Sequence, residues 1–342
     1  MIDWKIYSTH YREIASENGL RKNQIDKLLA YAKKLNDLDL PIIYDLKHFS
    51  LLVGYSDEYI LKASNNSIPF YRNFRIKKKS GRYRNISEPL PNLKDIQKWI
   101  LNNILYKIPV SKFAKAFIPN ITLKDNAKFH RSQNILLTID IENFFDSIRF
   151  IEVYKLFKHN GYSKGVSVLL SKLCTLEDRL PQGAPTSPYL SNMVFNSLDN
   201  RISQFCINRE IRYTRYADDL SFSGDFKPGM IIKFVKYVIK SKKLKLNKNK
   251  TRTMFNHQRQ EVTGIVVNKR MQVARNVRRK LRQDVFYIQK YGLNDHIRRK
   301  DIKESNYIKH LLGLSNFIKF VNPKDEKAVY NFDFLKQLLL RN

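Results

Sequence analysis

The sequence predicts a mixed helix and sheet protein, with an α/β or α+β core between helical ends. The runs "NILLTID" and "YTRYADDLSFSG" have the apolar, β-branched and aromatic character of strands. The segment "KNQIDKLLAYAKKLNDL" repeats its apolar residues at helical spacing, and beyond Gly264 the chain is helical and strongly basic. With 342 residues, 43% of them apolar, the chain can bury a core and form more than one lobe.

The elements follow in a clear order. Residues 1–60 are expected to form amphipathic helices, and a basic hairpin with its turn at Ser80 and Gly81 comes next. A strand ends at Asp140, and the helix after it has Ser147 as its expected N-cap and Gly161 just past its end. A long helix from Pro188 to Arg209 precedes a strand, a two-aspartate turn and a second strand. No internal repeat is visible.

The charge balance indicates a polyanionic partner. The chain has 63 Lys and Arg residues against 31 Asp and Glu residues, a formal charge of +32. No apolar run is long enough for a spanning helix, and the N-terminus lacks the apolar core of a signal peptide. We therefore expect a cytoplasmic protein that binds nucleic acid and no membrane. Cys174 and Cys206 are too few for a zinc cluster or a disulfide framework and are expected to be buried thiols.

Three carboxylates carry the chemical prediction. Asp218 and Asp219 alone would fit an ordinary solvated turn. Asp140, however, ends a buried strand, and two strands can bring three acids to one end of a sheet. Such a cluster repels itself unless it holds divalent cations, for which Mg²⁺ is the expected ion. Two Mg²⁺ ions roughly 3.5 to 4 Å apart are the arrangement that supports nucleotidyl transfer.

Several motifs together resemble a known family. "YADD", "LPQGAPTSPYLSN" and "IDIENFFDSI" resemble a bacterial reverse transcriptase, and "NAKFH" and "VTG" resemble the retron type. The resemblance implies an α+β right-hand polymerase with an N-terminal helical extension. The implied division is 1–60 for the extension, 61–130 for the fingers, 131–264 for the palm with interleaved fingers elements at about 150–185, and 265–342 for the helical thumb.

The resemblance also implies catalytic roles. Asp140 and Asp218 would ligate both ions, and Asp219 would support the second site or the primer end. The backbone carbonyl of Ile141 would reach a metal. Lys250 would protonate departing pyrophosphate, or is simply a surface lysine.

Contacts with the incoming nucleotide are implied as well. Phe145 would exclude the 2′-OH of a ribonucleotide. Its neighbour Phe144 is the competing candidate, because alternation along a strand would let only one of them face the pocket. The remaining expected dNTP contacts are Lys78 and Arg84, with Arg82 as a substitute, and Gln182.

Nucleic-acid contacts are expected mainly in the C-terminal part. Asn126 and His130 would contact RNA or serve the structure, and a core histidine is an equally good interpretation. The hairpin containing Val262, Thr263 and Gly264, with a turn at Asn268 and Lys269, would hold the primer. Tyr287, Tyr291 and Tyr307 are candidate stacking partners for bases. The cations expected to track phosphates are Arg275, Arg278, Arg279, Arg282, Arg298, Arg299 and Lys300.

Family resemblance further implies that the protein copies part of its own msr-msd non-coding RNA into msDNA. Synthesis would use dNTPs and start from the 2′-OH of an internal guanosine, in anti-phage defence with a separately encoded effector. Another bacterial reverse transcriptase, such as a group II intron maturase or a defence-associated type, is one alternative. A catalytically inactive RNA-binding scaffold and an RNA-dependent RNA polymerase are two others, and the intact aspartates oppose the scaffold.

Overall fold

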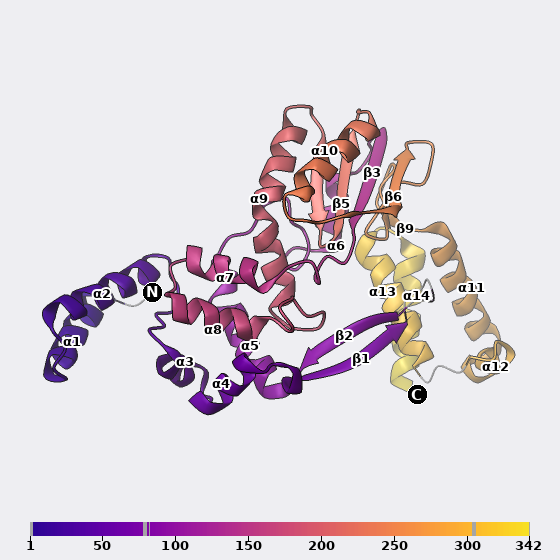
Figure 1. Ribbon diagram of the computed structural model, residues 1–342. Coiled ribbons are helices and arrows are strands. Elements are labelled where there is room, and N and C mark those ends of the chain that lie inside the picture. The colour runs from indigo at the N-terminus through magenta and orange to yellow at the C-terminus, as the bar shows by residue number, and fades with distance from the viewer. Residues whose placement is uncertain (1–2, 78–80, 82, 303–305, 342) are drawn as a thin grey trace. The chain divides into compact units, whose positions relative to one another are not determined.

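The computed structural model describes residues 3–77, 81, 83–302 and 306–341 (Figure 1). These residues form two compact units, each built from several stretches of the chain. The first unit contains 1–119, 141–203 and 235–246, and the second contains 120–140, 204–234 and 247–342. Every helix within the described ranges is too short or too polar to span a lipid bilayer.

The first unit is mainly helical. Four α-helices and a short 3-10 helix precede the first strand, in line with the helices predicted for residues 1–60. Asp3 and Ser56 cap two of the α-helices by accepting backbone N–H groups. The helices of this unit are α1 (Trp4–Glu17), α2 (Lys22–Asp37), α3 (Leu46–Val53), α4 (Asp57–Asn65), η1 (Ile68–Phe70), α5 (Pro91–Asn103), η2 (Leu105–Lys107), α7 (Phe150–His159), α8 (Lys164–Cys174) and most of α9 (Ser187–Ile207).

The start of α7 differs from the prediction. Its N-cap is Arg149, whose backbone N–H donates to the Glu152 carboxylate at 3.2 Å. Ser147 instead donates its hydroxyl to the Asn143 carbonyl, because it lies in the turn before the helix. Gly161 follows the helix with a φ of 103°, a conformation that glycine adopts at little cost, so the predicted end is confirmed.

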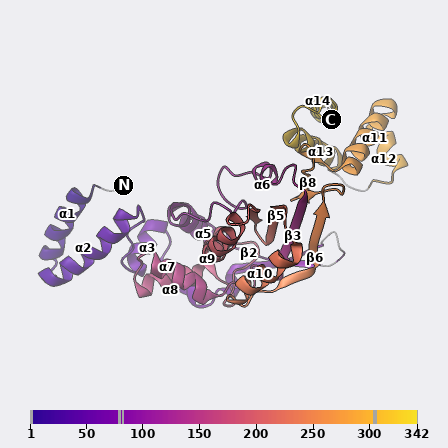
Figure 2. The same cartoon turned by 90° about the horizontal axis from the view of Figure 1, so that it is seen from above.

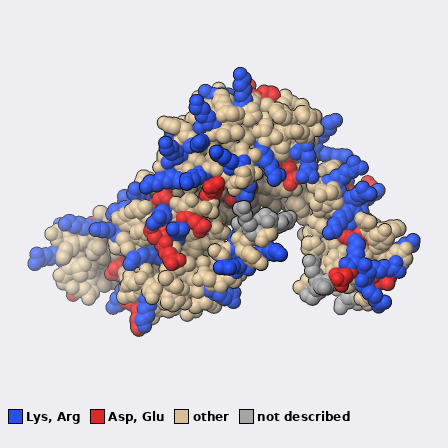
Figure 3. Space-filling model, turned by 45° about the vertical axis from the view of Figure 1, so that its right-hand side comes forward, with Lys and Arg blue, Asp and Glu red and all other residues tan. Residues whose placement is uncertain are grey.

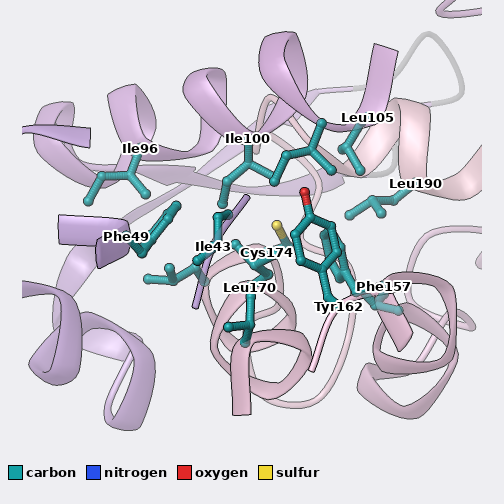
Figure 4. Packing of buried hydrophobic residues seen from close by; sticks show 14 of the residues in the cluster. Ile43, Phe49, Ile96, Ile100, Leu105, Phe157, Tyr162, Leu170, Cys174 and Leu190 are labelled. Atoms are coloured by element: carbon teal, nitrogen blue, oxygen red, sulfur yellow. The ribbon is translucent and has the colours of Figure 1, made fainter. Parts of the chain in front are cut away.

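One apolar cluster holds the first unit together. Figure 4 shows side chains from α5, α7 and α8 meeting there, among them Ile100, Phe157 and Leu170. Each such side chain contributes roughly 1.5–3 kcal/mol when it is fully buried. Cys174 is completely buried in this cluster, and burial raises the pKa of its thiol to about 12. Burial raises the pKa of Cys206 to about 12 as well, so both cysteines are the buried thiols that the sequence predicts.

The first unit contains a two-stranded hairpin, as predicted, and Ser80 of the predicted turn lies outside the described residues. Strands β1 (Tyr71–Lys77) and β2 (Tyr83–Pro89) pair antiparallel in the register that joins Tyr71 to Pro89 (Figure 1). Its base is fixed to the "LPQG" loop, because the Ser87 N–H donates to the Gln182 carbonyl at 2.8 Å. Gly183 lies against the same strand with a φ of 128°.

The second unit is built on a sheet of four strands in the order β4-β5-β3-β6 (Figures 1 and 2). Its strands are β3 (Ile135–Ile141), β4 (Arg212–Tyr216), β5 (Asp219–Gly224) and β6 (Leu246–Phe255). Strand β3 pairs antiparallel with β5, from Ile135 opposite Gly224 to Asp140 opposite Asp219. Both strands are buried along most of their length, which explains their apolar, β-branched and small residues. Helix α6 (Leu123–Phe129) also belongs to this unit, and α10 (Pro228–Lys240) is shared between the two.

The C-terminal part of this unit is a small sheet followed by helices. Strands β7 (Glu261–Val262), β8 (Ile265–Val266) and β9 (Gln272–Val273) form the sheet. Strands β7 and β8 are joined by a tight turn at Thr263 and Gly264. Strands β8 and β9 pair antiparallel, and the connection between them contains Asn268 and Lys269, so the predicted hairpin turn is confirmed. The predicted helices are α11 (Arg275–Tyr291), α12 (Leu293–Arg299), α13 (Tyr307–Val321) and α14 (Glu326–Arg341), and they share one apolar core with β7–β9 and α6.

The packing of the hairpin against the "LPQG" loop can be tested at Gly183. A Cβ added there would lie 2.7 Å from the Ser87 carbonyl oxygen, on a backbone that side chains rarely adopt. We expect Gly183→Ala to lower the free energy of unfolding by about 2 kcal/mol or more. Chemical denaturation measures this.

The matched control is Gly165→Ala, because Gly165 lies in α8 with open space around its Cα. That change should be neutral or stabilising. Equal effects of the two substitutions would contradict the role given to Gly183.

Candidate active site

The strand register brings the predicted acids to one end of the four-stranded sheet. Asp140 and Asp219 face each other across β3 and β5, and directly opposed residues place their side chains on the same face. Asp218 lies in the turn that joins β4 to β5. The residue before it, Ala217, is buried and has a φ of 55°, a left-handed conformation that is uncommon for residues other than glycine.

The acids influence one another electrostatically. The pKa of Asp219 is raised to about 6, first by burial and then by the negative charges of Asp218 and Asp140. Asp140 is itself only 5% exposed. A cluster of this kind is costly in the folded protein unless a cation accompanies it.

Lys250 supplies one such cation. It lies on β6, the neighbour of β3, and its ammonium donates to Asp140 Oδ2 at 2.7 Å. Burial acts to lower the pKa of Lys250, but the hydrogen bond to Asp140 and the charges of the three aspartates raise it more. The ammonium therefore stays charged and acts as a counter-ion to the cluster.

The aspartates also fit divalent metal ions by the chemistry of their donors. Their oxygens are hard ligands of the kind that Mg²⁺ prefers, and their mutual repulsion would be relieved by a doubly charged ion. No three His, Cys, Asp or Glu side chains in the described part of the chain are already drawn together as a metal-binding group. Lys250 occupies one oxygen of Asp140, and the second oxygen of the carboxylate is the one that an ion could reach without displacing the lysine.

Phe144 and Phe145 have different surroundings, although β3 has ended at Ile141 and both lie in turns. Phe144 is 3% exposed and packs on Phe195 at a ring distance of 5.2 Å. Phe145 is half-buried and lies 6.3 Å from the Phe117 ring. The core role therefore falls to Phe144, and Phe145 remains the residue with accessible ring surface.

The other predicted dNTP contacts belong to the first unit. Arg84 is exposed on β2, opposite Ile76 of β1. Gln182 is half-buried, and its backbone carbonyl is the group that fixes the hairpin. Lys78 and Arg82 lie outside the described residues.

Asn126 and His130 have no exposed surface in the second unit. His130 contacts the Ser223 hydroxyl at 2.8 Å and the Thr214 hydroxyl at 2.7 Å. Burial and the nearby charge of Arg212 lower the pKa of His130 to about 3, so its ring is neutral. Of the two roles that the sequence left open, this geometry supports the structural one, since buried side chains cannot touch RNA in this conformation.

The C-terminal cations divide into two groups. Arg278 pairs with Asp325 at 3.5 Å, Arg299 pairs with Asp295 at 2.7 Å, and Lys300 pairs with the buried Asp284. The other four, namely Arg275, Arg279, Arg282 and Arg298, are exposed, as are Arg299 and Lys300. Figure 3 shows Lys and Arg side chains at many places on the visible face of the molecule, with fewer Asp and Glu side chains among them.

The predicted primer-binding residues and stacking tyrosines also differ in exposure. Val262 is buried, Thr263 has a left-handed φ of 48°, and Gly264 is exposed, so only the turn presents itself to a ligand. Tyr307 is buried and contacts His296 at 3.1 Å, whereas Tyr291 is 40% exposed.

Three residues of the β4–β5 hairpin were missed by the sequence reasoning. Arg215 is completely buried and donates to the Ala217 carbonyl at 3.1 Å, which fixes the turn before Asp218. Thr214 and Ser223 are buried partners of His130. A signal was present, because polar residues inside strands that are otherwise apolar require hydrogen-bond partners.

Comparisons with known proteins identify the family of the chain. The model of the reverse transcriptase (RNA-dependent DNA polymerase) family matches residues 76–273. The retron Ec86 reverse transcriptase of Escherichia coli is 31% identical over 304 residues, covering 87% of this chain and 91% of that protein. The retron Mx162 reverse transcriptase of Myxococcus xanthus is 29% identical over 359 residues, covering 96% of this chain and 69% of that protein.

The chain thus belongs to the reverse transcriptases, whose fold is the right-hand polymerase fold and whose activity is RNA-directed DNA synthesis. Within that class it is a retron reverse transcriptase, since retron enzymes match it over most of its length. It uses a nucleic-acid template and dNTP substrates, and the family depends on divalent metal ions. The boundaries given above for fingers, palm and thumb stay a prediction.

The buried neutral His130 predicts acid sensitivity. In the unfolded chain a histidine takes up a proton below about pH 6.5, whereas the folded ring resists it down to about pH 3. Its contribution is therefore fully present above pH 6.5 and is lost as the pH falls towards 3. As the pH falls from 7 to 5, protonation of this histidine in the unfolded chain should lower the free energy of unfolding by about 2 kcal/mol.

Chemical denaturation at the two pH values measures the loss. The comparison is His130→Gln, which is less stable at pH 7 but lacks the titrating ring. Its stability should fall less between pH 7 and pH 5, by about the same 2 kcal/mol. An identical fall in both proteins would show that His130 is not buried as a neutral ring.

Proposed function

We propose that the protein copies part of its own msr-msd RNA into msDNA by two-metal nucleotidyl transfer, starting from the 2′-OH of an internal guanosine. The single observation that carries the chemistry is the register of β3 and β5, which sets Asp140 opposite Asp219 with Asp218 in the adjacent turn. The RNA, the branched start and the product come from membership of the retron family.

Asp140, Asp218 and Asp219 would hold two Mg²⁺ ions, with the Ile141 carbonyl as a further oxygen. The buried Ile141 side chain is compatible with this, because only its backbone would take part. When bound, the ions would activate the attacking hydroxyl and neutralise the charge of the leaving pyrophosphate. Lys250 lies where it can release Asp140 to an ion and remain nearby as the proton donor for pyrophosphate.

The substrate side of the proposal concerns other residues. Phe145 would lie beneath the sugar and exclude a 2′-OH, while Gln182, Arg84 and Lys78 would contact the dNTP. The exposed C-terminal arginines would track the phosphates of RNA and primer beside the turn at Thr263 and Gly264. A separately encoded effector in anti-phage defence would be the protein partner, as the family implies.

Loss of one carboxylate should abolish synthesis. Asp218→Asn keeps the shape but removes a charged ligand, so we expect DNA synthesis on a primed RNA template with Mg²⁺ to fall roughly a hundredfold or more. Nucleic acid purified with the wild-type protein from cells carrying its RNA gene should contain branched RNA-DNA, and that purified with Asp218→Asn should contain RNA alone.

The control is Asp333→Asn, an exposed position on α14, which should synthesise DNA normally. Undiminished synthesis by Asp218→Asn would refute the catalytic proposal. Unbranched DNA from the wild type would instead refute only the retron start.

Selection against ribonucleotides should depend on Phe145. In Phe145→Val the smaller side chain leaves room for a 2′-OH, so incorporation of rNTPs relative to dNTPs should rise about tenfold or more. Single-nucleotide primer extension measures the ratio. Phe144→Leu is the comparison, because Phe144 is buried and should affect stability rather than sugar choice. A ratio unchanged in Phe145→Val would exclude this residue as the steric gate.

A further inference from the structure

Four buried side chains in the second unit form a continuous chain of hydrogen bonds. Ser223 lies 2.8 Å from His130 Nδ1, and His130 Nε2 lies 2.7 Å from the Thr214 hydroxyl. The Thr214 hydroxyl in turn donates to Asn126 Oδ1 at 2.6 Å. Thr214 and Asn126 are completely buried, as are Ser223 and His130, so water does not compete for these bonds.

With Asn126 Oδ1 facing the Thr214 hydroxyl, the protons in this chain have one arrangement. A hydroxyl has a single proton, and Thr214 uses it on the Asn126 oxygen, which can only accept. Thr214 must therefore accept from His130, which requires the proton of the ring on Nε2. His130 Nδ1 is then unprotonated and accepts the Ser223 hydroxyl. The ring is neutral and in one tautomer.

The chain of bonds connects helix α6 to both arms of the catalytic hairpin. Asn126 lies in α6 and His130 directly follows it, whereas Thr214 lies in β4 and Ser223 in β5. These strands are joined by the turn that contains Asp218, and β5 begins with Asp219. Thr214 and Ser223 are each four residues from an aspartate, roughly 13 Å along an extended strand. They cannot touch the reacting atoms but can fix where the turn lies.

We propose that this hydrogen-bond chain, here called the relay, holds the β4–β5 hairpin in position for catalysis. It consists of Asn126, His130, Thr214 and Ser223, with every bond donated in one direction along the chain. The four are positioning residues, and this inference rests on the proposed role of Asp218 and Asp219. It gives the "NAKFH" segment a function inside the protein rather than at the RNA surface.

The surroundings of His130 keep the relay in its neutral form. The charged group that faces it is Arg212 of β4, whose guanidinium donates to the Phe129 carbonyl at 3.1 Å and to the Arg131 carbonyl at 3.4 Å. This cation opposes a second proton on the ring, as does burial. From β5 the facing group is the Ser223 hydroxyl, and from α6 it is the Asn126 amide acting through Thr214.

The first test is nuclear magnetic resonance of the full chain labelled with ¹⁵N in its histidine rings. The His130 signals, identified by their loss in His130→Gln, should show a proton on Nε2 and none on Nδ1 from pH 5 to pH 8. A ring that titrates in this range, or that carries its proton on Nδ1, would overturn the relay. This readout does not depend on polymerase activity.

The second test is a matched set of variants in primer extension. Thr214→Val keeps the shape of the side chain but leaves His130 Nε2 and Asn126 Oδ1 without partners, so kcat should fall about tenfold or more. Thr214→Ser retains the hydroxyl and should restore kcat to within about twofold of the wild type. Thr253→Val, on β6 and outside the relay, should leave kcat unchanged.

The outcomes separate the relay from the proposed function. A Thr214→Val variant with wild-type kcat, or a Thr214→Ser variant as poor as valine, would overturn the relay while Asp218→Asn still abolished synthesis. If Thr214→Val does not fold, Ser223→Ala replaces it, with Ser223→Thr as its rescue, and the tautomer measured in the wild type remains decisive. If His130 has its proton on Nε2 but the protein synthesises no DNA, the proposed polymerase function would be refuted and the hydrogen-bond chain would stand.

Discussion

The pairing of β3 with β5 is the constraint on which the acidic site depends. Side chains alternate between the two faces of a sheet, so a slip of one residue in this register would move Asp140 to the opposite face from Asp219. Both strands are buried along most of their length, so such a slip would exchange the side chains that pack on the two faces and break the contacts that they make. The core packing of the second unit and the geometry of its aspartates are therefore determined together.

The same end of the sheet brings together groups that destabilise the folded chain. Burial and the charges of Asp218 and Asp140 raise the pKa of Asp219, and Ala217 adopts a left-handed backbone. Opposing interactions surround them. Lys250 neutralises part of the negative charge, and Arg215 donates a hydrogen bond to the Ala217 carbonyl in the strained turn. His130, directly after α6, is hydrogen-bonded to both strands that flank the turn. Strain concentrated at one site and supported by its neighbours is usual where chemistry is carried out.

Much of this could be predicted from the sequence, for physical reasons that also explain the failures. Helices and strands follow local periodicity, so α2, β3 and the hairpin at Asp218 were foreseen. The N-cap of α7 was not, because several polar residues compete at that helix start and only the fold selects Arg149. The bond of Lys250 to Asp140 and the burial of His130 join residues far apart in the chain. No local pattern encodes such pairs, although the motif around His130 marked the position.

Both cysteines of the chain are buried among apolar side chains, and this has a practical consequence. Thiolates are the reactive form of cysteine, and these two thiols ionise only far above neutral pH. The two cysteines of the chain are therefore expected to react only slowly with maleimide reagents. A cysteine introduced on the β1–β2 hairpin or on α12 would accept a fluorophore selectively, which would let the movements of these parts be followed by energy transfer while DNA is being made.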